Sequence, residues 1–153
     1  MNMEFDETLK KFGYPKNLIK SYDNWYLLLR PEQLTLGSLI LFSKKKVSRY
    51  SDLDEKSFTE KHQIIVEIEN ILYNSFFCKK INYLMLMMVD PFVHFHIIPR
   101  YDSPIEFMQI RFQDPGWPAL PDFTFNNIIP ESKWSLFLKQ VSKEFQVTSK
   151  PNN

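Results

Sequence analysis

The sequence predicts an α+β fold in which helices pack against one face of an antiparallel sheet. Four short runs of bulky apolar residues are typical of buried strands. They lie at residues 25–29, 38–42, 82–88 and 93–99. Two stretches with apolar residues at helical spacing, 54–73 and 131–145, predict one long helix and a last helix near the end of the chain.

The first two predicted strands form a hairpin. Residues up to about Asp23 have a mixed composition, and a short helix is expected before Pro15. Trp25–Leu29 then forms one strand, and after a loop that ends at Gly37 the run 38–42 returns antiparallel to it.

The long helix is predicted from its first turn and from its apolar face. We expect Ser51 or Asp52 to cap it, because acidic residues follow where the helix dipole favours negative charge. Its apolar residues recur at spacings of three, four or seven, which places them on one side. They are Phe58, Ile65, Ile68 and Leu72. The corresponding residues of the last helix are Trp134, Phe137, Leu138 and Val141.

The strands 82–88 and 93–99 are expected to form a second hairpin. Pro91 lies between them, and because proline cannot adopt the positive φ of the tightest hairpin turns, we expect a loop of about four residues. In that register Met87 lies opposite His94.

Two of the three histidines lie on this last strand. Strand alternation places His94 and His96 on one face, roughly 6.5 Å apart. They could be metal ligands, although no third ligand is evident, or polar residues without chemistry. Alternatively, a neutral imidazole could attack an electrophile while the second supports the developing charge, since histidine has a reference pKa of about 6.5. Spacing alone does not decide between the last two interpretations.

Composition limits the class of protein. The chain has 153 residues, 44% hydrophobic and 24% charged, which suits one globular domain over 1–150 followed by a frayed tail at 151–153. A formal charge of +1 creates no long-range field for nucleic acid or membranes. Cys78 is the only cysteine, which excludes an internal disulfide and a cysteine-rich zinc site.

We expect a cytoplasmic protein, because the acidic start is unlike a signal peptide and no apolar run could span a bilayer.

The run Phe-Val-His-Phe-His-Ile-Ile-Pro-Arg, residues 92–100, resembles the signature of the histidine triad (HIT) family. That signature is His-φ-His-φ-His-φ-φ, where φ is apolar, and Pro-Arg often follows it. The preceding order of strand, strand and helix is similar as well, with Leu-Gly-Ser-Leu at 36–39 opening the second strand. The resemblance covers about residues 25–101. It implies a sheet of about five strands in a core at about 20–101, with a C-terminal extension over 102–150.

The resemblance implies a nucleotide hydrolase. His94 matches the family's nucleophile, which attacks the α-phosphorus of a nucleotide and forms a nucleotidyl-histidine. His96 matches the histidine that supports the phosphate oxygens. The expected substrate is a dinucleoside polyphosphate or a nucleoside phosphoramidate, and no metal or other cofactor is expected. Family members are often homodimers joined by the long helix and a strand edge, so we expect a homodimer.

Several positions differ from the family pattern. Phe92 replaces the first triad histidine and cannot hydrogen-bond a phosphate, while Ser38 stands where relatives often carry another histidine. Arg30 stands where relatives carry the Asn or Asp that holds the ribose, and it could instead bind a phosphate bidentately. We expect Arg30, Met87 and Phe92 at the substrate site. Trp117 is either the anchor of a packed loop or part of a flap over the site. A catalytically weak nucleotide-binding module is the alternative function.

Overall fold

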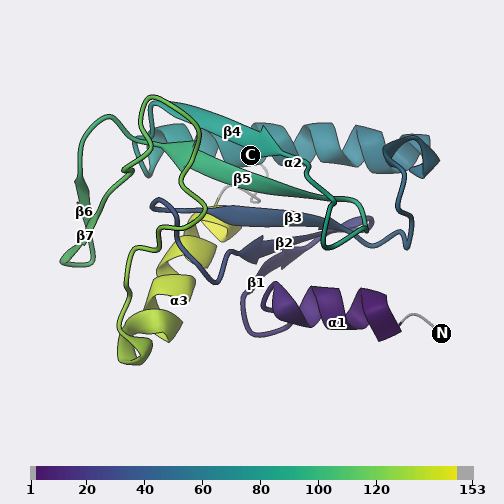
Figure 1. Cartoon of the computed structure of the whole chain (residues 1–153), viewed down its shortest axis with the longest axis horizontal. Coiled ribbons are helices and arrows are strands. Elements are labelled where there is room, and N and C mark those ends of the chain that lie inside the picture. The colour runs from purple at the N-terminus through teal and green to yellow at the C-terminus, as the bar shows by residue number, and fades with distance from the viewer. Residues whose placement is uncertain (1–2, 148–153) are drawn as a thin grey trace.

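The computed structural model describes residues 3–147, and its centre is a five-stranded antiparallel sheet (Figure 1). The strands are β1 (Leu18–Ser21), β2 (Trp25–Leu29), β3 (Leu39–Ser43), β4 (Lys80–Leu84) and β5 (His94–Arg100). Their order across the sheet is β1-β2-β3-β5-β4, so β4 forms one edge. A separate ribbon consists of β6 (Ile105–Phe107) and β7 (Ile110–Phe112). The α+β class and the antiparallel sheet are confirmed.

Helices lie on both faces of the sheet. The helices α2 (Glu55–Asn74) and α3 (Glu131–Val147) pack on one face, and α1 (Met3–Lys11) packs on the other (Figure 1). The predicted packing of the long helix and the last helix against one face is confirmed, and α1 covers the other face in addition. Among residues 3–147, no helix combines the length and apolar character that crossing a membrane requires. The predicted frayed tail at 151–153 lies outside the described residues.

The larger core lies between the sheet and the helix pair α2 and α3. The sheet contributes Leu27, Leu29, Leu39, Leu41 and Ile97, and the helices contribute Ile64, Ile68, Ile71, Leu72, Phe137, Val141 and Phe145. Each fully buried side chain of this size stabilises the fold by about 1.5–3 kcal/mol relative to exposure. The alternate side chains of the same strands point to the opposite face, where they meet α1.

The start of α2 differs from its prediction. The N-cap is Asp54, whose carboxylate accepts a hydrogen bond from the Ser57 backbone N–H at 2.9 Å. Ser51 and Asp52 belong instead to a short 3-10 helix, η1 (Tyr50–Asp52). An aspartate at the N-cap satisfies a free backbone N–H of the first turn, and nothing comparable caps η1. The helix therefore begins one turn later than a cap at Ser51 predicts.

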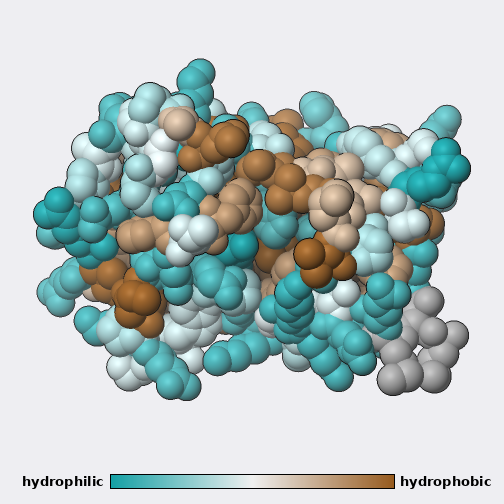
Figure 2. All heavy atoms as spheres, viewed as in Figure 1, coloured by the Kyte–Doolittle hydropathy of each residue, from teal (hydrophilic) through white to brown (hydrophobic). Residues whose placement is uncertain are grey.

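The hairpin between β4 and β5 also differs from its prediction. The strand β4 ends at Leu84, which pairs with His96, and residues 85–93 form the connection. Met87 has a φ of 52°, outside the range of extended strands, so it does not pair with His94. The predicted strand 82–88 is therefore confirmed as far as Leu84 and wrong beyond it, and the four-residue loop is wrong. Hydrophobic side chains gather on the surface over β5 and this connection (Figure 2).

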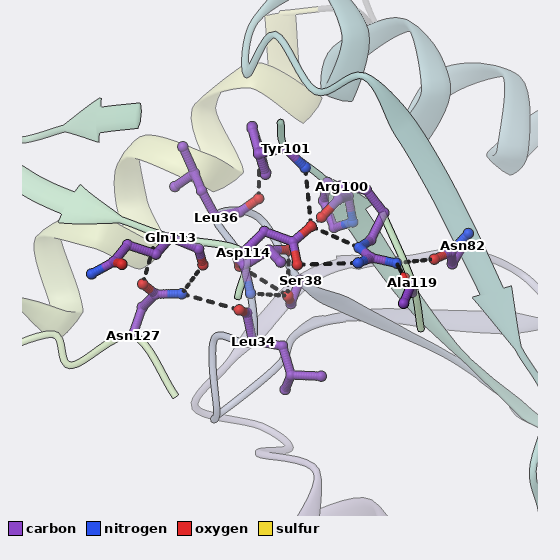
Figure 3. Close-up of polar contacts among 12 residues, drawn as sticks. Leu34, Leu36, Ser38, Asn82, Arg100, Tyr101, Gln113, Asp114, Ala119 and Asn127 are labelled. Atoms are coloured by element: carbon purple, nitrogen blue, oxygen red, sulfur yellow. Dashed lines mark hydrogen bonds and ion pairs between the residues drawn. The ribbon is translucent and has the colours of Figure 1, made fainter. Parts of the chain in front are cut away.

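A buried ion pair fastens the C-terminal extension to the sheet (Figure 3). Arg100 contacts both carboxylate oxygens of Asp114, at 2.7 Å and 3.2 Å. The same guanidinium donates to Asn82 and to the Ala119 carbonyl, both at 2.7 Å. Further along, the Asn127 amide donates to the carbonyls of Gln33, Leu34 and Gln113. The segment between Asp114 and Asn127 is thus held at both ends.

Candidate active site

The strand β5 places both imidazoles on the sheet face that α1 covers. Their ring centroids lie 5.1 Å apart with planes at 80°, and His94 and His96 are 2% and 8% exposed. Phe42 lies opposite His94 on β3, and Ile40 lies opposite His96. The prediction that both histidines share one face is confirmed. They are embedded in apolar surroundings rather than on a solvated face.

The tautomer of His94 is set by a backbone contact. Its Nδ1 lies 2.6 Å from the carbonyl oxygen of Phe92. Because a carbonyl oxygen can only accept, Nδ1 carries the proton and Nε2 of the neutral ring keeps its lone pair. This is the tautomer that a nucleophilic histidine requires. The ring is also held by Phe12, with centroids 5.0 Å apart, and by stacking on Phe42.

Burial keeps both imidazoles neutral. Burial lowers the pKa of His94 below its ordinary value of 6.5, and the Phe92 carbonyl opposes part of that effect. The pKa of His96 falls to about 4, mainly through burial and further through the charge of Arg30. At neutral pH both rings are therefore uncharged, which leaves a lone pair on each available for attack or for accepting a hydrogen bond.

Arg30 follows directly on β2 and reaches the second histidine. Its Nε lies 3.5 Å from Nδ1 of His96, and its Nη1 donates to the Glu32 carbonyl at 3.0 Å. The guanidinium carbon lies 5.5 Å from the ring centroid of Phe123, which also meets the His96 ring edge-on at 5.7 Å. One side of the site is therefore built from the segment after β2 and from the C-terminal extension.

A cavity of about 280 Å³ opens beside the imidazoles. Its lining consists of Lys11, Leu86, Met87, Met88, Val89, Asp90, His94 and His96. Lys11 and Asp90 form an ion pair of 2.8 Å, so the charges on this wall offset each other. The remaining lining from the connection is apolar, and Met88 and Val89 are 87% and 83% exposed. The cavity can hold one small group next to His94, with apolar contacts on one side.

The fold is shared with solved histidine triad proteins. One from Sinorhizobium meliloti has 19% identity and a TM-score of 0.70, over 91% of this chain and 94% of that one. One from Bradyrhizobium japonicum has 18% identity and a TM-score of 0.65, over 90% and 94%. The chain has the histidine triad fold.

More distant HIT structures match as well. A Plasmodium falciparum diadenosine triphosphate hydrolase in complex with cyclomarin A has 14% identity and a TM-score of 0.55, over 94% of this chain and 92% of that one. No protein-family profile and no curated protein sequence matches the chain. The likeness is therefore one of three-dimensional structure, and it confirms the fold that residues 92–100 predict.

The side chain of Phe92, the residue that the sequence resemblance matches to the first signature position, belongs to the α1 interface. Its ring meets Phe5 edge-on, with centroids 5.1 Å apart, in the apolar cluster beneath α1. That Phe92 lies at the substrate site stays a prediction; in the structure its partly buried ring packs against that cluster. The contribution of this residue to the site is its carbonyl oxygen, which orients His94.

Neither Ser38 nor Trp117 lines the cavity beside the imidazoles. Ser38 is fully buried, and its Oγ donates to the Thr35 carbonyl at 2.9 Å. Trp117 lines a different cavity of about 780 Å³ along β4, together with Tyr83 and Leu120. Ser38 is thus a structural residue of the β2–β3 connection, and Trp117 belongs to the edge of the sheet.

Sequence reasoning missed four residues of the site. Lys11 ends α1 and Phe12 follows it directly; Phe5, Leu9 and Phe12 recur at helical spacing, a signal for an apolar face. Asp90 and Phe123 lie in segments without regular structure, so no periodic pattern in the sequence predicts their place in the site. Among residues 3–147, no group of three His, Cys, Asp or Glu side chains is arranged to hold a metal ion.

Proposed function

We propose that this protein is a HIT-type nucleotide hydrolase that cleaves a dinucleoside polyphosphate or a nucleoside phosphoramidate. The observation that carries the proposal is the contact between His94 Nδ1 and the Phe92 carbonyl, which leaves the Nε2 lone pair free. A second neutral imidazole and a cavity large enough for one small group lie beside it. A nucleophile, a charge-supporting partner and space for substrate are the parts that covalent catalysis needs.

The reaction proceeds in two displacements on phosphorus. Nε2 of His94 attacks the α-phosphorus, a nitrogen–phosphorus bond forms, and the bond to the leaving group breaks. The leaving group departs with the bonding electron pair and takes up a proton. Water then attacks the same phosphorus, the electron pair returns to His94, and a proton goes to solvent. The nucleoside monophosphate is released, and the imidazole is restored.

The second imidazole and Arg30 support the charge on the transferred phosphate. His96 lies beside His94 and is neutral, so it can donate a hydrogen bond without adding a desolvated charge. The Arg30 guanidinium stays protonated at neutral pH and brings a positive charge to the same side. Together they compensate for the missing first triad histidine, for which Phe92 offers no hydrogen-bonding side chain.

The test is turnover by variants that differ at one histidine. Diadenosine tetraphosphate and adenosine phosphoramidate are offered to the wild type, His94→Ala and His62→Ala. His62 is exposed on α2, so it serves as the matched control. We expect His94→Ala to lose turnover by about 10³-fold or more, because no covalent path remains, and His62→Ala to keep it. Mass spectrometry should detect a nucleotidyl adduct on the wild type and on the control. Equal turnover by His94→Ala and wild type would contradict the proposal.

A weakly active nucleotide-binding module is the second candidate, and the placement of Phe92 favours it. The first triad position supplies only an apolar ring to the α1 cluster. Calorimetric binding of a mononucleotide without turnover of either substrate would establish this alternative. Turnover that depends on His94 would exclude it.

We also propose that the protein forms a homodimer through α2 and the edge strand. Within residues 3–147 the strand β4 pairs only with β5, which leaves its outer edge without a strand partner. Apolar side chains are exposed on α2 and just after it, with Val66 56% and Phe77 66% exposed. Light scattering should give twice the mass of the 18.4 kDa chain. The Val66→Lys variant should shift that mass toward the monomer, and a monomeric wild type would refute the dimer.

A further inference from the structure

Arg30 presents a hydrogen-bond donor to a defined atom of the second histidine. Its Nε–H points at Nδ1 of His96 over 3.5 Å, and no other hydrogen-bonding group within residues 3–147 contacts that ring nitrogen. A guanidinium only donates, since all of its nitrogens carry protons. A proton on Nδ1 of His96 would therefore face the N–H of Arg30. The arrangement favours the tautomer in which Nδ1 is bare and Nε2 carries the proton.

The two imidazoles are thus held in opposite tautomers. The Phe92 carbonyl accepts from Nδ1 of His94, which leaves a lone pair on Nε2. Arg30 donates to Nδ1 of His96, which leaves an N–H on Nε2 of that ring. With ring centroids 5.1 Å apart, the pair offers one nucleophilic nitrogen and one donor to a single group bound between them.

Arg30 is itself fixed by its surroundings. Its side chain is 12% exposed, Nη1 contacts the carbonyl and the carboxylate of Glu32 at 3.0 Å and 3.4 Å, and Phe123 packs against the guanidinium face. Phe123 is carried by the segment that Asp114 and Asn127 anchor at its ends. A donor restrained in this way loses little further entropy when it orients a neighbouring ring.

We propose that Arg30 is a positioning residue that holds His96 in the neutral Nε2–H tautomer beside the nucleophile. One consequence rests on the proposed hydrolase function. In that reaction His96 donates a hydrogen bond to a phosphate oxygen throughout. A hydrogen-bond donor is thereby supplied in a chain whose first triad position carries phenylalanine.

The charges around His96 agree with a neutral ring. Arg30 from the segment after β2, His94 from β5 and Lys11 from α1 each disfavour a further positive charge. Asp90, from the connection before β5, favours it, but its carboxylate is paired with Lys11. Removal of Arg30 is therefore expected to raise the pKa of His96 from about 4 toward its ordinary 6.5.

Nitrogen-15 NMR of the imidazoles tests the proposal without any substrate. In the labelled wild type at pH 7 we expect a bare Nδ1 on His96 and a protonated Nδ1 on His94. Signals are assigned with His62→Ala and His94→Ala. Arg30→Met removes both the donor and the charge, so the His96 tautomers should mix and its pKa should rise. Arg30→Lys restores a cationic donor, so the tautomer population and the pKa of His96 should return toward their wild-type values. Arg49→Met, at an exposed arginine, is the matched control.

The result that overturns the proposal is a wild-type His96 protonated on Nδ1, or an Arg30→Met spectrum equal to that of the wild type. The wild-type spectrum reports the tautomer of His96 and therefore tests the proposal even if Arg30→Met does not fold. Activity gives the second readout. Arg30→Met should lower turnover roughly tenfold to hundredfold, the usual effect of removing a residue that orients a reactive side chain, and should move the acid limb of the rate profile to higher pH. If no substrate is turned over, the hydrolase function fails, while the spectra still decide the role of Arg30.

Discussion

Lys11 Nζ lies 2.8 Å from Asp90 Oδ2, and this contact joins the end of α1 to the connection before β5. The lysine side chain is 56% exposed and the aspartate side chain is 17% exposed. Such a partly solvated pair contributes less than about 1 kcal/mol to stability. Its importance lies in its place, because both residues line the cavity beside the imidazoles.

The first prediction concerns which leaving group this cavity accepts. Asp90→Asn removes the negative charge from the wall and leaves Lys11 without its partner. The ratio of kcat/KM for diadenosine tetraphosphate to that for adenosine phosphoramidate should rise roughly threefold to tenfold, because a polyphosphate carries several negative charges past this wall. Steady-state kinetics on both substrates measure the ratio. Asp52→Asn, at an exposed aspartate in η1, should leave it unchanged. An unchanged ratio in Asp90→Asn would show that the leaving group does not pass Asp90.

The elements with a regular apolar pattern were predictable from sequence. Trp25–Leu29 matches β2, and the predicted helix 54–73 matches α2 apart from its cap. His94 and His96 follow from the two-residue period of a strand, which holds whatever the strand pairs with. Local periodicity therefore predicts the sheet face that carries the imidazoles.

Features that depend on tertiary contacts were not predictable in this way. The apolar run 82–88 has strand character, yet its second half leaves the sheet, and Leu86, Met87 and Met88 line the cavity beside the imidazoles. Phe123 reaches His96 only because Asp114 and Asn127 fasten the extension at distant points. Neither the ion pair of Asp114 with Arg100 nor the fold-back of the extension leaves a periodic signal in the sequence.

The second prediction concerns the buried ion pair of the extension. Asp114→Ala leaves the guanidinium of Arg100, 4% exposed, without its carboxylate. Because an unpaired buried charge is strongly unfavourable, the free energy of unfolding should fall by about 3–5 kcal/mol. Urea unfolding measures it, with Asp102→Ala at an exposed aspartate as the control. A loss below about 1 kcal/mol would mean that water or another acceptor reaches Arg100.

The third prediction concerns Phe92, where the resemblance to the HIT signature expects a histidine. Phe92→His places a polar ring against Phe5 within the α1 cluster, where the native ring makes an edge-to-face contact at 5.1 Å. We expect the free energy of unfolding to drop by about 1–2 kcal/mol, because a polar ring replaces an apolar one in a partly buried apolar contact. Turnover should rise less than about threefold, since the new ring remains in the cluster.

Phe92→Leu is the matched variant, because it keeps an apolar side chain at the same position and leaves the backbone carbonyl that orients His94. It should retain turnover close to that of the wild type. A gain of a hundredfold or more in Phe92→His would instead mean that the histidine ring turns into the site, and that phenylalanine suppresses catalysis in the native chain.

The last prediction concerns the dependence of stability on pH. His96 has a pKa of about 4 in the folded protein and about 6.5 in the unfolded chain, so the unfolded state binds a proton first as the pH falls. The stability that this residue contributes is thus fully present above pH 6.5 and is lost progressively between pH 6.5 and about 4, by up to about 3 kcal/mol.

Urea unfolding at intervals across this range measures the loss in the wild type and in His96→Gln, which has no titrating ring. The glutamine variant should lose less stability over the same interval, and His62→Gln should behave as the wild type. Identical slopes for the wild type and His96→Gln would mean that His96 is protonated in the folded protein at pH 6, which neither its burial nor the charge of Arg30 allows.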